Sequence, residues 1–248
     1  MRGVHRYGRR RIQAGQLFLP AGPGPHPIAV VLHGGFWQAA YGRRLMSGLS
    51  ADLAANGVAA WNLDYRGVGG GGGWPATFDD VAAGIDALAT TPGLDLTRVT
   101  AIGHSAGGQL ALWAAARPGL PAGAPGASPA VTVTAAVALA GVMDLVDADR
   151  RGIGAGAVSR LLGGRADAVP ERYRLASPLE RLPLGVPQLL VHGGRDRHVP
   201  VDVSERYADA ARAKGDSVDL AVLAEVGHME LIDPRSAGWA VAVDWLRR

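Results

Sequence analysis

The chain has 248 residues, of which 48% are hydrophobic and 19% are charged, proportions of a globular domain and not of a disordered chain. It contains no cysteine, which excludes disulfide bonds, a thiolate nucleophile and cysteine-bound zinc. The net charge of +3 is carried mainly by arginines scattered along the sequence, with short clusters such as Arg9-Arg10-Arg11. This small and dispersed excess does not indicate a nucleic-acid partner.

The N-terminal region gives no targeting signal. Residues 1–20 include basic side chains but no apolar core of the kind that a signal peptide needs. No apolar run reaches the ~18 residues that a membrane span requires. We therefore expect a cytoplasmic protein without a membrane partner, active as a monomer or a homodimer.

Strand-like and helix-like runs alternate along most of the chain. Residues 4–19 alternate enough to form one or two edge strands. Further strands are predicted at 28–32, 58–63, 99–102, 131–139, 187–191 and 218–223, and helices at 45–55, 78–89, 109–116, 203–213 and 236–246. The alternation predicts an α/β fold, with a mostly parallel central sheet of about eight strands covered by helices on both faces. We find no repeat or boundary, so residues 1–248 are expected to form one domain.

Two segments depart from this alternation. Gly69–Gly73 is a run of five glycines, either a flexible connector or a mobile lip beside Trp74. Residues 143–183 lie between two predicted strands and contain helical fragments. That segment is long enough to form a small cap over the strand ends.

The most informative motif is Gly103-His104-Ser105-Ala106-Gly107, which reads G-x-S-x-G. It lies between a predicted strand and a predicted helix. A tight turn there would push the Ser105 hydroxyl out of the sheet and place a helix N-terminus beneath any developing negative charge. The two glycines are needed because a side chain at either position would collide with a neighbouring strand or helix. Ser105 is therefore the candidate nucleophile.

A serine nucleophile needs a base, and the base needs an acid to orient it. Such groups lie at the carboxyl ends of strands in open α/β sheets, where Asp196 and His228 follow two predicted strands. They occur in the chain order serine, acid, histidine that is expected when G-x-S-x-G carries the nucleophile of an α/β sheet, so we expect His228 to be the base and Asp196 the acid. Asp144 is the alternative acid, and Glu225 is a weaker one.

No cofactor or metal is expected. His192 and His198 flank Asp196, but no third ligand joins them at the spacing that a metal site requires.

The stretch His33-Gly34-Gly35-Phe36-Trp37 follows the first buried strand. Two adjacent glycines allow bare backbone N–H groups to approach a substrate carbonyl oxygen. We therefore expect the oxyanion hole to form around Gly34, Gly35 and Phe36, with the N–H of Ala106 as the second donor. An ordinary Gly-Gly turn is the alternative interpretation.

These motifs together resemble the α/β-hydrolase superfamily over about residues 15–247. The nearest branch contains small carboxylesterases, feruloyl-esterase-like proteins, kynurenine formamidases and the catalytic domains of prolyl-oligopeptidase-like peptidases. The motifs that carry the resemblance are His33–Trp37, Asp64-Tyr65-Arg66, Gly103–Gly108, Asp196–Pro200 and Gly227-His228.

The resemblance implies an α/β-hydrolase fold, Ser105, Asp196 and His228 as catalytic residues, and an oxyanion hole at Gly34, Gly35, Phe36 and Ala106. In hormone-sensitive-lipase-like relatives the Tyr-Arg pair is followed by Leu-Ala-Pro-Glu, whereas here Gly67-Val68 and the glycine run follow it. This departure argues against a hormone-sensitive-lipase-like enzyme and leaves undecided which residues form the pocket wall. The candidate pocket residues are Trp37, Trp74 and His104.

The sequence is compatible with three functions. The first is a serine carboxylesterase that cleaves esters of small or medium acyl groups through an acyl-enzyme. The second is an arylformamidase-like enzyme that hydrolyses an N-formyl amide with the same residues. The third is a non-hydrolytic binding protein that keeps the pocket of the fold. In the first two the partner is a small-molecule ester or amide substrate.

Overall fold

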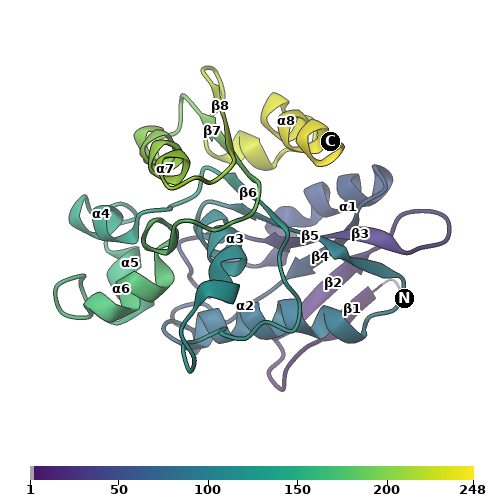
Figure 1. The fold of residues 1–248 in the computed structure, drawn as a ribbon, viewed down its shortest axis with the longest axis horizontal. Helices are drawn as coiled ribbons and strands as arrows, with labels where there is room; N and C mark the ends of the chain where they lie inside the picture. Colours follow the sequence, from purple (N-terminus) through teal and green to yellow (C-terminus); the bar gives the residue numbers. More distant parts are fainter. Residues whose placement is uncertain (1–2) are drawn as a thin grey trace.

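The computed structural model describes residues 3–248, and they form an eight-stranded sheet covered by helices on both faces (Figure 1). The strand order is β1-β2-β4-β3-β5-β6-β7-β8. β1 pairs antiparallel with β2 and β2 antiparallel with β4, while all other pairs are parallel. The strands are β1 (Gly3–Arg6), β2 (Ala14–Phe18), β3 (His26–Leu32), β4 (Ala59–Leu63), β5 (Leu94–His104), β6 (Ala135–Leu139), β7 (Gln188–Gly193) and β8 (Val218–Leu223).

The helices divide between the two faces because the central strands are apolar on both sides. Along β3, Ile28, Val30 and Leu32 pack with one layer, and Ala29 and Val31 pack with the other. Helices α1 and α8 cover the second layer, and α2, α3 and α7 cover the first. The α-helices are α1 (Ser47–Ala55), α2 (Ala76–Asp86), α3 (Ala106–Ala116), α4 (Leu145–Arg150), α5 (Ala157–Leu162), α6 (Pro170–Ala176), α7 (Asp202–Ala213) and α8 (Ala237–Leu246).

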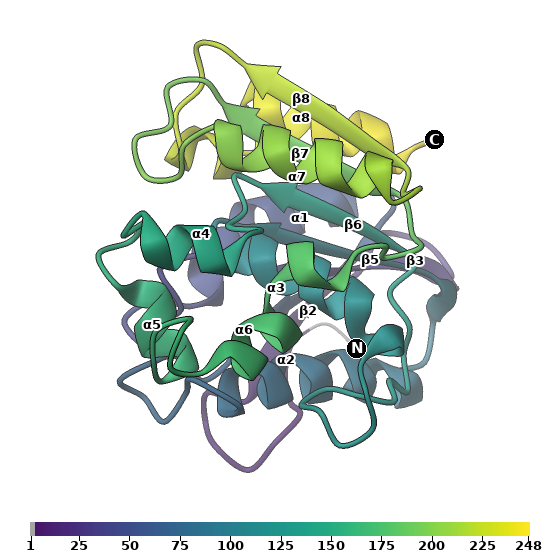
Figure 2. The same ribbon diagram turned by 60° about the vertical axis from the view of Figure 1, so that its left-hand side comes forward.

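Three short helices, α4, α5 and α6, lie together between β6 and β7 in sequence, where the segment 143–183 was expected to form a cap (Figure 2). Short 3-10 helices fill several of the remaining connections: η1 (Arg43–Met46), η2 (Ala87–Thr90), η3 (Arg117–Gly119), η4 (Pro178–Arg181) and η5 (Met229–Ile232). Among the residues that the model describes, no helix has the length and apolarity to cross a bilayer.

The predicted α/β-hydrolase fold is confirmed, with differences at the element ends. β5 begins at Leu94, before the expected start at 99. The early start was not predicted because the first half of the strand carries polar and exposed residues, which hide the strand pattern. The strand expected at 131–139 begins only at Ala135. Val131 and Val133 are buried, but they pack as parts of a loop against the core. Their apolar side chains therefore gave a false strand signal.

Candidate active site

Ser105 lies on the tight turn between β5 and α3. Its backbone has φ 54° and ψ −118°, a strained conformation for a residue with a side chain, and only 5% of the residue is exposed. The Ser105 N–H donates to Leu139 O at 2.8 Å, which fastens the turn to the end of β6. The fold thus holds one serine in a sharp turn at the carboxyl edge of the sheet.

The glycines of the motif are required by close approach. A Cβ at Gly103 would lie 1.9 Å from Gly107 O, and a Cβ at Gly107 would lie 2.2 Å from Leu32 O. Both distances are far inside van der Waals contact with backbone atoms that cannot move aside. The predicted reason for these glycines is therefore confirmed.

His228 and Asp196 meet beyond the ends of β8 and β7. The Nδ1 of His228 lies 2.5 Å from Asp196 Oδ2, and the other carboxylate oxygen accepts hydrogen bonds from the N–H groups of His198 (2.8 Å) and Val199 (2.9 Å). Burial raises the pKa of Asp196, but hydrogen bonds from His192, His228 and Val199 outweigh it and hold the pKa well below its ordinary value. Asp196 is therefore an ionised, fixed partner for His228.

His104 connects this pair to the turn of Ser105. Its ring centroid lies 4.5 Å from that of His228, and its Nε2 lies 3.0 Å from His228 O. Burial, together with the nearby His228, lowers the pKa of His104 to about 3, so the ring is neutral at physiological pH and its Nε2–H donates to that carbonyl. His228 thus lies directly beside the serine turn. The Ser105 hydroxyl itself makes no hydrogen bond within the described residues.

The two alternative acids lie elsewhere. Asp144 caps α4, where its side chain accepts from the N–H of Asp147 at 3.0 Å. Glu225 is exposed and forms an ion pair with Arg195. Neither interacts with His228, which leaves Asp196 as its partner.

The loop after β3 packs directly against the serine turn. A Cβ at Gly34 would lie 2.9 Å from His104 O and 3.2 Å from Ser105 Cβ. Gly35, Phe36 and Trp37 then adopt positive φ angles of 109°, 55° and 55°. This unusual run turns the backbone amides out of any regular pairing. Within the described residues, the N–H groups of the four expected donors, Gly34, Gly35, Phe36 and Ala106, donate to no protein acceptor.

Two neighbours after β4 hold this loop in place. The Tyr65 hydroxyl donates to His33 O at 2.8 Å, and the two rings stack with centroids 4.2 Å apart. The N–H of Val68 donates to Trp37 O at 2.7 Å. Burial lowers the pKa of His33, which therefore stays neutral under Tyr65. Tyr65 of the Asp64-Tyr65-Arg66 motif thus supports the loop that carries Phe36.

Gln109 is a functional candidate that sequence reasoning missed. It is fully buried one turn after Ser105 on α3. Its Oε1 accepts from Trp37 Nε1 at 2.9 Å, and its Nε2 donates to Ala176 O at 2.8 Å. One amide therefore ties together the loop after β3, the serine helix and the α4–α6 segment. A polar residue at a position that the helix period places in the core was the available signal.

A narrow apolar cleft opens beside Ser105. Its volume of about 10 Å³ is about what a single water needs. The lining residues are Phe36, Trp37, Ser105, Ala106, Val142, Ile153, Gly154, Val158 and Val199.

Of the three expected pocket residues, the structure places only Trp37 in this lining. Trp74 packs edge-on against Phe78 with centroids 5.1 Å apart, and His104 is buried beneath the turn. The assignment of Trp74 and His104 to the substrate pocket stays a prediction. In this structure Trp74 packs on Phe78, and His104 contacts His228.

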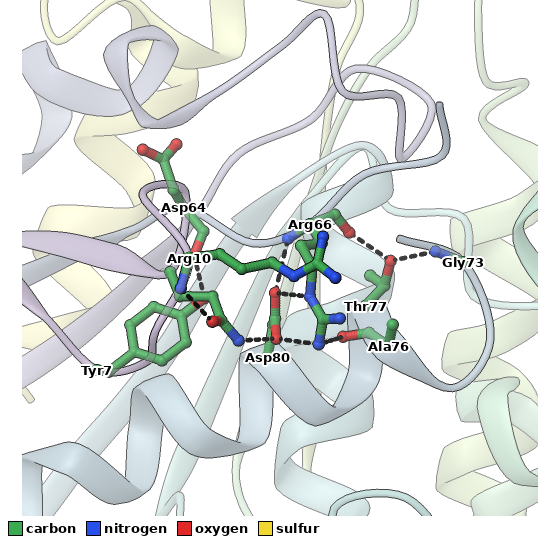
Figure 3. Close-up of polar contacts among 9 residues, drawn as sticks. Tyr7, Arg10, Asp64, Arg66, Gly73, Ala76, Thr77 and Asp80 are labelled. Atoms are coloured by element: carbon green, nitrogen blue, oxygen red, sulfur yellow. Dashed lines mark hydrogen bonds and ion pairs between the residues drawn. The ribbon is translucent and has the colours of Figure 1, made fainter. Parts of the chain in front are cut away.

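The five-glycine run is a folded turn anchored to a buried ion pair (Figure 3). Arg66 binds Asp80 through its Nε at 2.8 Å and its Nη2 at 2.7 Å. Its backbone oxygen accepts from Thr77 Oγ1, which in turn accepts from the N–H of Gly73. A Cβ at Gly72 would lie 2.0 Å from Arg66 O, so close backbone packing explains that glycine.

Comparison with known proteins agrees with this geometry. The family model BD-FAE matches residues 16–210, a stretch that includes Ser105 and Asp196 and ends before His228. Over 222 residues the chain is 32% identical to "Esterase LipC" of Mycobacterium tuberculosis, covering 84% of this chain and 52% of the relative. The chain therefore spans about half the length of that curated relative.

Solved structures share the fold at low sequence identity. A truncated carbohydrate esterase from gut microbiota superposes with a TM-score of 0.87 at 20% identity, covering 99% of this chain and 94% of that one. Esterase 2 of Thermogutta terrifontis, in a form phosphonylated by sarin, gives a TM-score of 0.81 at 20% identity, covering 98% and 92%. These likenesses establish the architecture.

Proposed function

The chain belongs to the BD-FAE family of α/β-hydrolase esterases, and from this premise we propose that it hydrolyses carboxylic esters through an acyl-enzyme formed on Ser105. The observation that carries the proposal is the buried hydrogen bond between His228 and Asp196 beside the strained turn of Ser105. This arrangement supplies the base and the orienting acid that a serine nucleophile needs.

In the first half-reaction, His228 Nε2 takes the proton from Ser105 Oγ as that oxygen attacks the ester carbonyl carbon. Asp196 holds the proton on His228 Nδ1 and stabilises the imidazolium that forms. The tetrahedral oxyanion accepts hydrogen bonds from the free N–H groups of Phe36 and Ala106, each worth about 3 kcal/mol in the transition state.

Collapse of this intermediate breaks the bond between the carbonyl carbon and the alcohol oxygen. The imidazolium of His228 gives its proton to that oxygen, and the alcohol departs. A water then loses a proton to His228 and attacks the acyl-enzyme in the same way. The second collapse returns the proton to Ser105 and releases the carboxylic acid.

The narrow cleft favours small acyl groups. Its walls are apolar, and about 10 Å³ leaves no room for a long chain unless side chains shift. Among acyl groups, acetyl therefore requires the least movement of the lining side chains. Medium acyl groups would require displacement of Phe36 or Ile153.

The curated relative and the structural neighbours reported above are named as esterases, which favours an ester over an N-formyl amide. The test is to compare kcat/KM for p-nitrophenyl acetate and for N-formylkynurenine with the same purified protein. We expect the acetate to be preferred. A higher kcat/KM for the formamide would replace the ester proposal with the arylformamidase one. If the protein binds these compounds but hydrolyses neither, a non-hydrolytic role is favoured.

A further inference from the structure

Arginines that are scattered along the sequence gather in one cleft. This cleft has a volume of about 950 Å³, within the range of small-molecule sites. Four arginines line it, and Asp64 is the one acidic lining residue. The four are Arg6, Arg11, Arg43 and Arg44. The lining therefore carries an excess of positive charge that composition alone did not reveal.

Two of these arginines are available to a ligand. Arg43 is engaged, since its guanidinium pairs with Asp64 and its N–H donates to the same carboxylate at 2.7 Å. Arg11 and Arg44 are exposed, and within the described residues neither guanidinium makes a hydrogen bond or an ion pair. Two uncompensated guanidiniums on one concave surface create a positive potential that attracts anions.

The walls of the cleft are held by partly buried hydrogen bonds. The turn that carries Arg11 is held on both sides. Before it, the Tyr7 hydroxyl donates to Asp64 O at 2.7 Å (Figure 3). After it, Gln13 Nε2 donates to Asp80 Oδ1 at 2.7 Å. The opposite wall is held by Asn62 Nδ2, which donates to the backbone oxygen of Arg43 at 2.9 Å. The free arginines thus project from a preorganised frame.

The cleft lies on the same edge of the sheet as Ser105. Arg6 at the end of β1 pairs with Ala14, next to which Gly15 pairs with Leu63 at the end of β4. Strands that neighbour one another lie about 4.8 Å apart, which places β4 about 10 Å and β1 about 19 Å from β5. A substrate that extends about 10 Å from the serine turn can therefore reach the side of the cleft at the end of β4.

Tyr41 joins the two regions. Its ring packs on the bare backbone of Gly35, where an added Cβ would lie 2.2 Å from Tyr41 Cγ. The ring is 41% exposed and also lines the arginine cleft. One face of the loop after β3 therefore meets Ser105, and Tyr41 on the same loop opens onto the arginines.

We propose that the arginine cleft binds a carboxylate carried by the alcohol part of the ester substrate. The inference rests on the proposed esterase function. The acyl and alcohol parts leave a carbonyl carbon in different directions, and the narrow apolar cleft at Ser105 cannot accept a charge. The wide arginine cleft suits the alcohol part, because this part must leave the site before water can attack the acyl-enzyme.

The test uses three esters. The first is 4′-acetoxybiphenyl-4-carboxylate, which carries its charge two rings away on the alcohol side. The second is the neutral 4-carboxamide of the same ester, and the third is the mono-p-nitrophenyl ester of suberic acid, with its charge on the acyl side. kcat/KM is measured for the unsubstituted protein and for Arg11→Gln, Arg44→Gln and Arg98→Gln. Arg98 is an exposed arginine in the first half of β5, near the amino-terminal ends of the strands and away from Ser105, and it serves as the matched control.

We expect the unsubstituted protein to prefer the biphenyl carboxylate over the carboxamide, and the preference to shrink as salt is added. Arg11→Gln and Arg44→Gln should each lower kcat/KM for the carboxylate about fivefold, the range of one partly exposed charge pair, and leave the carboxamide unchanged. Arg98→Gln should change neither. Equal turnover of carboxylate and carboxamide, or preference for the suberate ester, would overturn the proposal.

Calorimetric titration of Ser105→Ala with the biphenyl carboxylate separates this proposal from the esterase proposal. If no ester is hydrolysed but binding is present and weakened by Arg44→Gln, the esterase proposal fails and the anion cleft stands. If the carboxamide ester is hydrolysed and the carboxylate neither binds nor reacts better, the cleft fails alone.

Discussion

The imidazole of His228 and the carboxylate of Asp196 are joined by a hydrogen bond of 2.5 Å between Nδ1 and Oδ2, and the Asp196 side chain is fully buried. The bond fixes which nitrogen of His228 carries the proton and leaves Nε2 free for the role of base that we propose. Asp196 receives further hydrogen bonds from two backbone N–H groups. The pair is therefore a rigid unit.

Replacing Asp196 by asparagine should lower kcat for p-nitrophenyl acetate by about a thousandfold or more, because the amide stabilises the wrong tautomer of His228 and no imidazolium. Asp144→Asn is the matched control, since Asp144 caps α4 and does not touch His228. That control should lose at most about 1 kcal/mol of stability and keep its activity. Equal losses of activity in the two variants would remove Asp196 from the mechanism.

Gln109→Met should lower both stability and activity. The substitution leaves the Trp37 indole N–H and the Ala176 carbonyl unpaired in the core, at a cost of about 3 kcal/mol, and frees the loop that carries Phe36. We expect kcat to fall more than KM rises.

Gln188→Met provides the control for this effect. Gln188 is an equally buried glutamine at the start of β7, bonded to Asp216 and Tyr207 far from the serine turn. Denaturant unfolding should show a similar loss of stability, while kcat stays unchanged. A fall in kcat for both variants would mean that Gln109 acts through stability alone.

His104 should make stability depend on pH. The folded protein keeps His104 neutral down to a pKa of about 3, whereas in the unfolded chain a histidine binds a proton below about pH 6.5. The unfolded state therefore binds more protons between these values, and the free energy of unfolding falls as pH falls, by about 1.4 kcal/mol per pH unit from this residue.

The measurement is urea unfolding at several pH values between 6 and 4 for the unsubstituted protein and for His104→Gln. The variant should show the shallower slope, because its side chain does not titrate. Parallel slopes in the two proteins would show that His104 is not buried in the neutral form.

Ser105→Gly should be more stable than Ser105→Ala by about 1 kcal/mol. Alanine keeps a Cβ at a φ of 54°, and glycine adopts this conformation without a steric penalty. Thermal unfolding of the two inactive variants checks the prediction. A more stable alanine variant would mean that the turn relaxes when the hydroxyl is removed.

The fold was predictable from the sequence because its signals are local. Apolar runs such as 28–32 mark strands buried on both faces, and Gly103 and Gly107 mark a turn where no side chain fits. Asp196 and His228 could be selected because each follows such a run. The boundaries of β5 and β6 were less accessible, since exposed polar residues such as Arg98 can lie in a strand and buried valines such as Val131 can lie in a loop.

The features that sequence reasoning missed depend on pairing across the chain. Gln109 gains its importance from Trp37 and Ala176, which lie 72 and 67 residues away. Arg11 and Arg44 line one cleft because β1 pairs with β2, and β2 in turn pairs with β4. Trp74 lies next to the glycine run in sequence, but its ring packs on Phe78.

We propose Ser105 as the nucleophile. The most direct test is intact-mass and peptide mass spectrometry after treatment with a fluorophosphonate, for the unsubstituted protein, Ser105→Ala and His228→Ala. We predict one adduct per chain, on Ser105, in the unsubstituted protein, a much slower adduct in His228→Ala, and none in Ser105→Ala. An adduct on another residue, or an adduct that persists in Ser105→Ala, would show that Ser105 is not the nucleophile.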